Sequence, residues 1–329
     1  MKLEDLGEFG LIGRIAARVT PMAGIRIGIG DDAAAVETEP GTVSLLTTDM
    51  LLEGVHFDLT FCTPENLGWK SLAVNLSDIA AMGGKPRYCL LSLAVPQAVP
   101  VSFIDSFIVG LLACAAEFGV TLIGGDTCAS RSGLVVSLTV MGEQLPERVV
   151  PRSGARPGDI ILVTGTVGDS ALGLRQLMAG QREGKAILRH LEPSPRVREG
   201  LKLADEKLPT AMIDVSDGLL ADLGLILKLS GVGAHIELKS LPLSPEVAAH
   251  ISCQVDDPFN FPLSGGEDYE LLFTIPPDRE AAVRKALSPF GTSATVLGKI
   301  TTSGLTVVDL NGKDYPVIAR GYNHFSPVH

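Results

Sequence analysis

Six short segments of the sequence place a carboxylate beside glycine, serine or threonine, and these acids are the residues best suited to chemistry. The segments are G-I-G-D-D at 28–32, T-T-D at 47–49, N-L-S-D at 75–78, G-G-D-T at 124–127, D-V-S-D-G at 214–218 and G-G-E-D at 265–268. Each one alone is ordinary turn or helix-capping chemistry. Their number, with most of them in the first 130 residues, favours a shared site instead.

If these segments converge, their charges must be neutralised. Two unit charges about 4 Å apart repel by roughly 4 kcal/mol at an effective dielectric constant of 20. Carboxylate and threonine oxygens are hard ligands that suit Mg²⁺, which proteins usually hold through a few carboxylates together with phosphate oxygens. The pattern therefore predicts a site for Mg²⁺ and a phosphorylated ligand.

Asp78 lies in the stretch Lys70–Gly84, which has the spacing of a helix. Leu72, Leu76 and Ile79 fall at i, i+4 and i+7, and two glycines follow. No Lys or Arg lies three or four residues from Asp78, so a salt bridge within the helix is excluded. Asp78 is then either an exposed acid on an ordinary helix or the centre of the shared site.

Length and composition indicate a globular protein of two domains. The chain has 329 residues, 46% hydrophobic residues and 36 glycines. Its net charge of −11 disfavours binding to nucleic acid or to an anionic membrane. Neither the N-terminus nor the apolar run at 107–116 fits a signal peptide or a membrane span, so we expect a cytoplasmic location.

The five cysteines are scattered and include no C-x-x-C pair, so neither a disulfide framework nor a structural zinc site is indicated. We expect them to be small buried side chains in a reducing compartment.

Strands and helices alternate irregularly, which predicts an α+β (mixed α/β) fold. We expect helices at 1–20, 70–84, 102–118 and 219–229, and strands at 25–30, 43–46, 88–95, 120–123, 134–142, 160–164, 211–215, 235–238, 269–275, 295–297 and 305–309. Pro146–Asp159 is rich in Pro, Gly and Arg, as linkers are. The predicted domains are residues 1–148 and 149–329.

Common nucleotide-binding motifs are absent. The chain has no G-x-x-x-x-G-K-[ST], no third glycine after Gly28–Gly30, and no H-R-D or D-F-G signature. A glycine-containing turn at 165–173 could cradle a phosphate, but such turns are common.

The strings that carry most of these acids resemble the thiamine-monophosphate kinase family. They follow one another in the order of that family over nearly the whole chain, and they differ from those of the related aminoimidazole ribonucleotide and selenophosphate synthetases. The strings are G-I-G-D-D-A-A (28–34), T-T-D-M-L-L-E-G-V-H-F (47–57), K-S-L-A-V-N-L-S-D-I-A-A-M-G (70–83), L-I-G-G-D-T (122–127), P-R-S-G-A-R-P-G-D (151–159), D-V-S-D-G-L (214–219) and L-S-G-G-E-D-Y-E-L (263–271).

This resemblance implies ATP-dependent phosphorylation of thiamine monophosphate to thiamine diphosphate. It implies a homodimer whose N-terminal sheets pair into a barrel-like core, with a C-terminal α/β domain flanking it. The implied Mg²⁺ ligands are Asp32, Thr47, Thr48, Asp49, Asp78, Asp126, Asp214 and Asp217. The implied contacts are Gly125, Asp126, Arg152 and Ser216 to ATP, and His56 and Glu267 to the thiamine part.

Alternatives remain open from the residues themselves. Taken alone, His56 fits a surface histidine, Arg152 a linker cation and Glu267 a turn acid. The family often has an aromatic residue that stacks on the substrate where this chain has Ala319, so stacking would fall to Tyr322 or another aromatic. The chain could also be another ATP-using enzyme acting on a ribonucleotide or small oxyanion, or a catalytically silent Mg²⁺-nucleotide-binding regulator.

Overall fold

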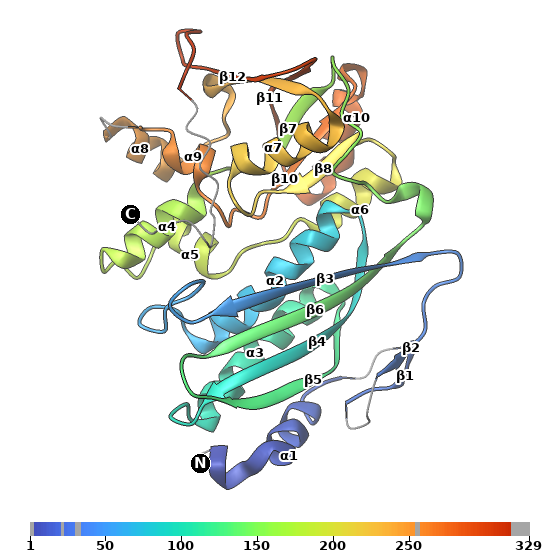
Figure 1. Cartoon of the computed structure of the whole chain (residues 1–329), viewed down its shortest axis with the longest axis vertical. Coiled ribbons are helices and arrows are strands. Elements are labelled where there is room, and N and C mark those ends of the chain that lie inside the picture. The colour runs from blue at the N-terminus through green and yellow to red at the C-terminus, as the bar shows by residue number, and fades with distance from the viewer. Residues whose placement is uncertain (1–2, 21–22, 30–33, 254–256, 317–329) are drawn as a thin grey trace. The chain divides into compact units, whose positions relative to one another are not determined.

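The computed structural model describes residues 3–20, 23–29, 34–253 and 257–316. The chain divides into two compact units (Figure 1). The first unit comprises residues 1–79 and 84–147, and the second comprises residues 80–83 and 148–329.

A four-stranded sheet forms the frame of the first unit. Its order is β3 (Val43–Leu52), β6 (Val135–Gln144), β4 (Lys85–Pro96) and β5 (Thr121–Ser130), and only β4 and β5 run parallel. Helices α2 (Pro64–Ala81) and α3 (Val101–Phe118) cover one face of this sheet (Figure 1). The unit also contains α1 (Leu3–Ala16), β1 (Ile25–Ile27) and β2 (Ala35–Val36).

Two strands of this sheet run further than the sequence predicts. We expected strands to end at residues 46 and 123, yet β3 continues to Leu52 and β5 to Ser130. The segments 47–49 and 124–126 therefore lie inside paired strands, not at strand ends. Thr47 and Thr48 are β-branched and stay in register with β6. Position 125 requires glycine for the strand to continue, because a Cβ there would lie 1.8 Å from the Leu91 carbonyl oxygen.

Helix α2 confirms the predicted helix across Asp78 but begins earlier, at Pro64.

Helix α3 has 18 residues and a mean hydropathy of 1.8, so its length and composition would allow it to cross a membrane. Its residues Ile104, Phe107, Ile108 and Leu111 are buried in the first unit. A core helix passes the same test, so this is weak evidence for a membrane span.

A six-stranded sheet forms the frame of the second unit. Its order is β12 (Leu305–Val308), β9 (Gly233–Glu237), β11 (Ala294–Thr301), β7 (Ile160–Thr164), β10 (Leu271–Ile275) and β8 (Ala211–Asp214). All neighbours are antiparallel except β12 and β9. Its helices are α4 (Asp169–Met178), α5 (Lys185–Leu191), α6 (Val197–Asp205), α7 (Leu219–Ser230), α8 (Pro245–Cys253), α9 (Asn260–Ser264) and α10 (Glu280–Leu287). With its open sheets and many helices the fold is mixed α/β, as predicted.

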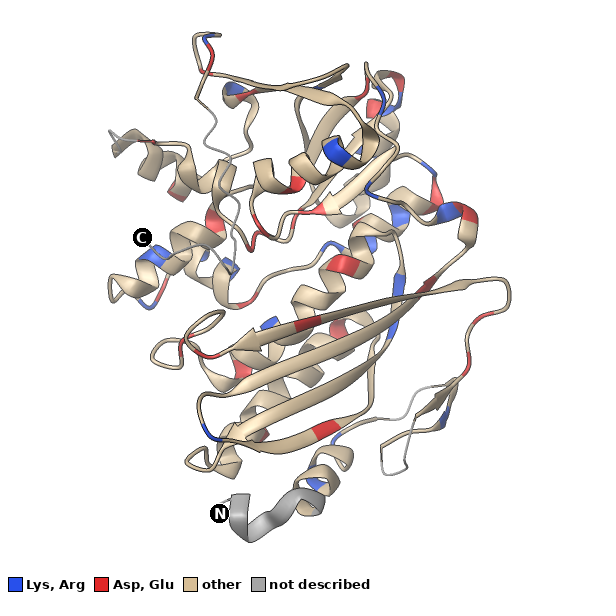
Figure 2. Ribbon diagram, in the orientation of Figure 1, with Lys and Arg blue, Asp and Glu red and all other residues tan. Residues whose placement is uncertain are grey.

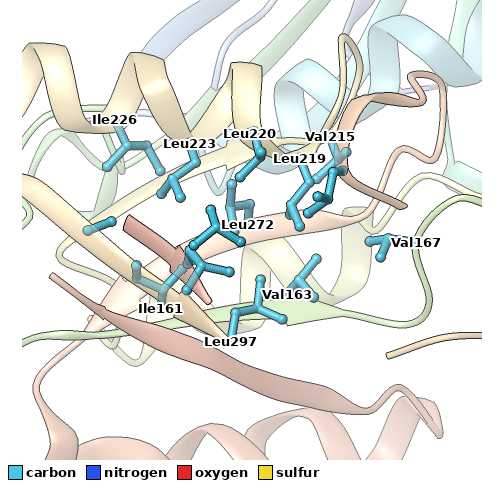
Figure 3. Packing of buried hydrophobic residues seen from close by; sticks show 14 of the residues in the cluster. Ile161, Val163, Val167, Val215, Leu219, Leu220, Leu223, Ile226, Leu272 and Leu297 are labelled. Carbon is cyan, nitrogen blue, oxygen red and sulfur yellow. The ribbon is translucent and has the colours of Figure 1, made fainter. Parts of the chain in front are cut away.

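The core of the second unit lies between its sheet and α7 (Figure 3). Leu223 and Ile226 of α7 pack with side chains of one parity along the strands, such as Ile161 and Leu272. Leu162 and Phe273, of the opposite parity, are also fully buried. Because both faces of the sheet are covered, its strands read as continuous apolar runs in the sequence.

The expectation that all the cysteines are buried is wrong for two of them. Cys62, Cys89 and Cys114 are buried, and burial raises the pKa of Cys89 to about 12. Cys128 and Cys253 are exposed. Cys128 lies in the second half of β5, the edge strand of the sheet, where none of the residues from Gly124 to Ser130 is buried.

A buried aspartate fixes the loop that precedes β10. Asp268 is 2% exposed, and its carboxylate accepts hydrogen bonds from the backbone N–H groups of Gly168 (2.6 Å) and Ser170 (3.1 Å). Burial raises its pKa to about 7, against the lowering effects of these two bonds and of Arg189. The acid thus ties this loop to the start of α4.

We predict that Asp268 makes the protein less stable as the pH rises from about 4 to 7. Its folded pKa of about 7 lies above the ordinary aspartate value of 3.8, so the folded state binds more protons in that window and the free energy of unfolding falls. The loss should be about 1–4 kcal/mol. Denaturant unfolding at several pH values should show a flatter pH dependence for Asp268→Asn than for the wild type.

The exposed residue Asp278 provides the control for this measurement. Asp278→Asn should keep the wild-type slope. An unchanged slope in Asp268→Asn would contradict the prediction, even if that variant is less stable at every pH because it loses an acceptor.

Candidate active site

Strand β3 directs two of the predicted ligands toward α2. Thr47 and Asp49 alternate with exposed neighbours and share one face of the strand with the buried residues Leu45 and Leu51. The Thr47 hydroxyl donates a hydrogen bond of 2.5 Å to Oδ2 of Asp78, which α2 presents. Asp78 is therefore half-buried and bonded to β3, and is not an exposed acid on a solvated helix face.

Asp49 and Asp78 form a pair of like charges. Burial, and secondarily the charge of Asp78, raises the pKa of Asp49 to about 6. Carboxylates held in this way, with a threonine hydroxyl beside them, have the donor chemistry that Mg²⁺ prefers, and a divalent cation would remove their repulsion. These residues therefore fit the implied metal.

The described residues do not by themselves complete a metal site. No group of three or more His, Cys, Asp or Glu side chains among them is gathered closely enough to hold a metal ion. Asp32 lies outside the described residues. A bound Mg²⁺ would need oxygens beyond this pair, as expected for an ion that also binds phosphate.

Two other predicted ligands of the first unit take the opposite face of the sheet. Thr48 donates to the Leu138 carbonyl oxygen (3.0 Å) and accepts from the Thr139 hydroxyl (3.2 Å). Asp126 pairs with Ser92 on the open face, is exposed, and accepts from the Thr127 N–H (2.9 Å). Figure 2 shows acidic positions within both β3 and β5. Strand alternation thus separates these side chains from Asp49 and Asp78.

The open face of this sheet carries a hollow of about 890 Å³. Gly124, Gly125 and Asp126 line it together with Leu90 and Thr139. This volume is within the range of small-molecule and cofactor sites. The predicted ATP contacts Gly125 and Asp126 therefore lie in a concave surface.

His56 lies in the turn after β3. Its Nδ1 accepts a hydrogen bond of 3.0 Å from the Leu52 N–H, so the neutral ring carries its proton on Nε2. The turn is closed by the bond from the His56 N–H to the Leu52 carbonyl oxygen (2.9 Å). The ring is half-buried and fixed.

In the second unit a single carboxylate shapes the segment 214–218. Asp214 ends β8, and the next residues form a loop leading into α7. Asp222 Oδ2 accepts from the N–H groups of Ser216 (3.0 Å), Asp217 (3.1 Å) and Gly218 (3.2 Å). Burial, followed by the nearby charge of Asp217, raises the pKa of Asp222 to about 7. Ser216 and Asp217 are therefore held in place.

The sequence interpretation missed Asp222. Its signal was available, since an Asp in the first turn of a predicted helix is well placed to bind free N–H groups. In the string D-V-S-D-G-L-L-A-D, the role of the last Asp becomes clear only once the loop is known to fold back on the helix.

Glu267 lies in a second loop bonded to the first. Its N–H donates to the Ser216 carbonyl oxygen (2.8 Å), and the Tyr269 N–H donates to that of Val215 (2.9 Å). Gly266 permits this approach, because a Cβ there would lie 2.4 Å from the Ser216 oxygen. The structure therefore brings Glu267 next to Ser216 within the second unit.

Arg152 is exposed on the segment that follows residue 148. This segment is bonded to the second unit, since the Met212 N–H donates to the Pro151 carbonyl oxygen (3.1 Å) and the Ser230 hydroxyl accepts from Gly154 and Ala155. The predicted positions Ala319 and Tyr322 lie outside the described residues.

Comparisons with known proteins identify the family. The chain matches the family described as "AIR synthase related protein, N-terminal domain" over residues 30–144 and "AIR synthase related protein, C-terminal domain" over residues 156–311. The thiamine-monophosphate kinase of Escherichia coli strain K12 is 40% identical, over 97% of this chain and 98% of that protein.

Two solved structures are similar over nearly the whole chain. The thiamine-monophosphate kinase of Stenotrophomonas maltophilia K279a has a TM-score of 0.83 and 39% identity, covering 94% of this chain and 98% of that one. AaThiL complexed with AMPPCP and TMP has a TM-score of 0.76 and 36% identity, covering 99% of both chains. With both domain models matched and 40% identity over nearly the full length, the chain belongs to the thiamine-monophosphate kinase family, within the AIR synthase related proteins.

Proposed function

We propose that this protein transfers the γ-phosphoryl group of ATP to thiamine monophosphate, producing thiamine diphosphate. The observation that carries this proposal is the near full-length similarity to AaThiL complexed with AMPPCP and TMP. The half-buried pair Asp49–Asp78, beside the Thr47 hydroxyl, supplies the acidic centre that such a reaction requires.

The chemistry we propose is a direct in-line transfer. A phosphate oxygen of thiamine monophosphate attacks the γ-phosphorus of ATP, and the bond from that phosphorus to the ADP oxygen breaks. The attacking phosphate is already anionic, so no strong general base is required. Catalysis then depends on positioning and charge stabilisation, which is general for phosphoryl transfer.

The acidic residues would hold several Mg²⁺ ions together with the phosphates. When bound, these ions would neutralise the charge on the phosphates. The residues we assign to them are Asp32, Thr47, Thr48, Asp49, Asp78, Asp126, Asp214 and Asp217. Gly125, Asp126, Arg152 and Ser216 would contact ATP, and a guanidinium such as that of Arg152 can bind phosphate oxygens in a bidentate manner. His56 and Glu267 would contact the thiamine part.

The test of this function is the formation of thiamine diphosphate from thiamine monophosphate, ATP and Mg²⁺. Release of ADP with a ribonucleotide or a small oxyanion, but not with thiamine monophosphate, would favour another ATP-using enzyme of the superfamily. Mg²⁺-dependent ATP binding without turnover would favour a silent regulator. Product formation only with thiamine monophosphate is the expected result.

Substituting Asp78 should abolish most activity without unfolding the protein. Asp78→Asn keeps the size of the side chain but removes the charge beside Thr47 and Asp49, so we expect turnover to fall by about 100-fold or more. Thermal unfolding should show that the variant remains folded. Glu117→Gln, which removes an exposed charge from the same unit, should keep wild-type activity. Full activity of Asp78→Asn at ordinary Mg²⁺ would contradict the assignment.

We further propose a homodimer that forms through the open face of the first unit's sheet. Leu46, Met50 and Leu90 expose 70%, 56% and 38% of their surface on this face. Exposed apolar side chains gathered on one sheet face often mark an interaction surface. Pairing of two such faces would produce the barrel-like core.

Sedimentation analysis tests this assembly. The wild type should have twice the 34.6 kDa mass of one chain, and Leu46→Glu should shift it toward the monomer. Val109→Glu, at a position 55% exposed on α3, is the matched control and should leave the dimer intact. A monomeric wild type would rule out the assembly.

A further inference from the structure

A histidine in the second unit lies behind the predicted substrate contact. His190, on α5, is 4% exposed, and its Nδ1 is 3.2 Å from Oε2 of Glu267. Ser170, in the first turn of α4, places its hydroxyl 3.0 Å from the same nitrogen. The side chain of Glu267 is 27% exposed, so one part of it contacts the buried ring while another part reaches the surface.

The backbone at Glu267 leaves little freedom to this side chain. Glu267 has φ = 66°, in the left-handed region that glycine favours, and its N–H is bonded to Ser216. Asp268, the next residue, is anchored to the start of α4. Non-glycine residues in such conformations persist only where their surroundings enforce them, and they often mark functional positions.

The helices that carry Ser170 and His190 are packed closely together. A Cβ on Gly173 of α4 would lie only 2.1 Å from the Ala186 carbonyl oxygen of α5, so the two backbones are in direct contact. Ser170 is 1% exposed. The Ser170 hydroxyl and the Glu267 carboxylate therefore contact the same nitrogen of a buried ring.

Hydrogen-bond chemistry assigns the direction of this contact. An ionised carboxylate can only accept a hydrogen bond, so the Nδ1–H group donates to Glu267, and the Ser170 hydroxyl at the same nitrogen can then only accept. A hydrogen bond to an ionised group is stronger and more directional than one between neutral groups. The ring can therefore set the orientation of the carboxylate.

We propose that His190 is a positioning residue that orients Glu267 for the acceptor substrate. The inference rests on the proposed function, in which Glu267 contacts thiamine. Thiamine carries a cationic thiazolium and an amino-bearing pyrimidine, and both complement a carboxylate. ATP is a polyanion, so an effect transmitted through Glu267 should change the use of thiamine monophosphate and leave the use of ATP unchanged.

The experiment compares His190→Asn with His190→Leu. The two replacements have similar size, but only the asparagine amide offers an N–H near the position of Nδ1. We expect His190→Leu to raise KM for thiamine monophosphate by about tenfold to a hundredfold, the usual effect of losing a hydrogen bond to a charged group. His190→Asn should recover most of this loss, and KM for ATP should stay within about twofold in both variants.

A double-mutant cycle shows whether His190 acts through Glu267. In a Glu267→Gln background, adding His190→Leu should change KM for thiamine monophosphate by less than twofold beyond Glu267→Gln alone. Independent, multiplying effects would overturn the inference, as would equal increases in both KM values. If His190→Leu fails to fold, His190→Gln replaces it, because its amide reaches the position of Nε2 instead of Nδ1, and it should remain defective where His190→Asn is rescued.

Failure of the proposed function would look different. A wild type that forms no thiamine diphosphate would refute the function itself. A wild type that is active, with a His190→Leu variant of unchanged KM, would refute only the role of His190.

Discussion

Repulsion between carboxylates that the fold itself holds together is the constraint on which the candidate site depends. Asp49 lies near Asp78 in the first unit, and Asp217 lies near Asp222 in the second. Burial first, and the neighbouring charge second, raise the pKa of Asp49 and that of Asp222. Folding would be easier if these acids pointed into water. The protein instead fixes Asp78 with the Thr47 hydroxyl in the first unit, and Asp222 with backbone N–H groups in the second. Such preorganised charge favours a cationic ligand and is costly without one.

Close backbone contact is the second requirement, and glycine provides it. Gly125 allows β5 to lie against Leu91, and Gly266 allows one site loop to bond to the other. Gly173 brings α4 against α5, behind Glu267. These positions explain in steric terms why so many glycines accompany the acids in the sequence. Because glycine has no Cβ, two backbones can approach closely at these positions, and this close approach fixes the neighbouring acids.

Much of the architecture was predictable from the sequence, and the limits of that prediction have physical causes. Apolar periodicity located α2, α7 and β7, because core burial fixes such patterns. The strands β3 and β5 were predicted too short, since Gly and Asp weaken a strand locally while pairing with neighbouring strands sustains it. Asp222 and His190 were missed because their roles depend on contacts between segments that only the folded chain brings together.

Consecutive residues of strand β3 place their side chains on opposite faces of its sheet. Thr47 and Asp49 face α2, while Thr48 between them faces the open side. A shift of one residue in its pairing with β6 would exchange the two faces and expose Asp49 away from Asp78. A single insertion or deletion within 43–52 would therefore be far more damaging than two together, because only an even change restores the parity. This stretch should accept substitutions during evolution much more readily than changes of length.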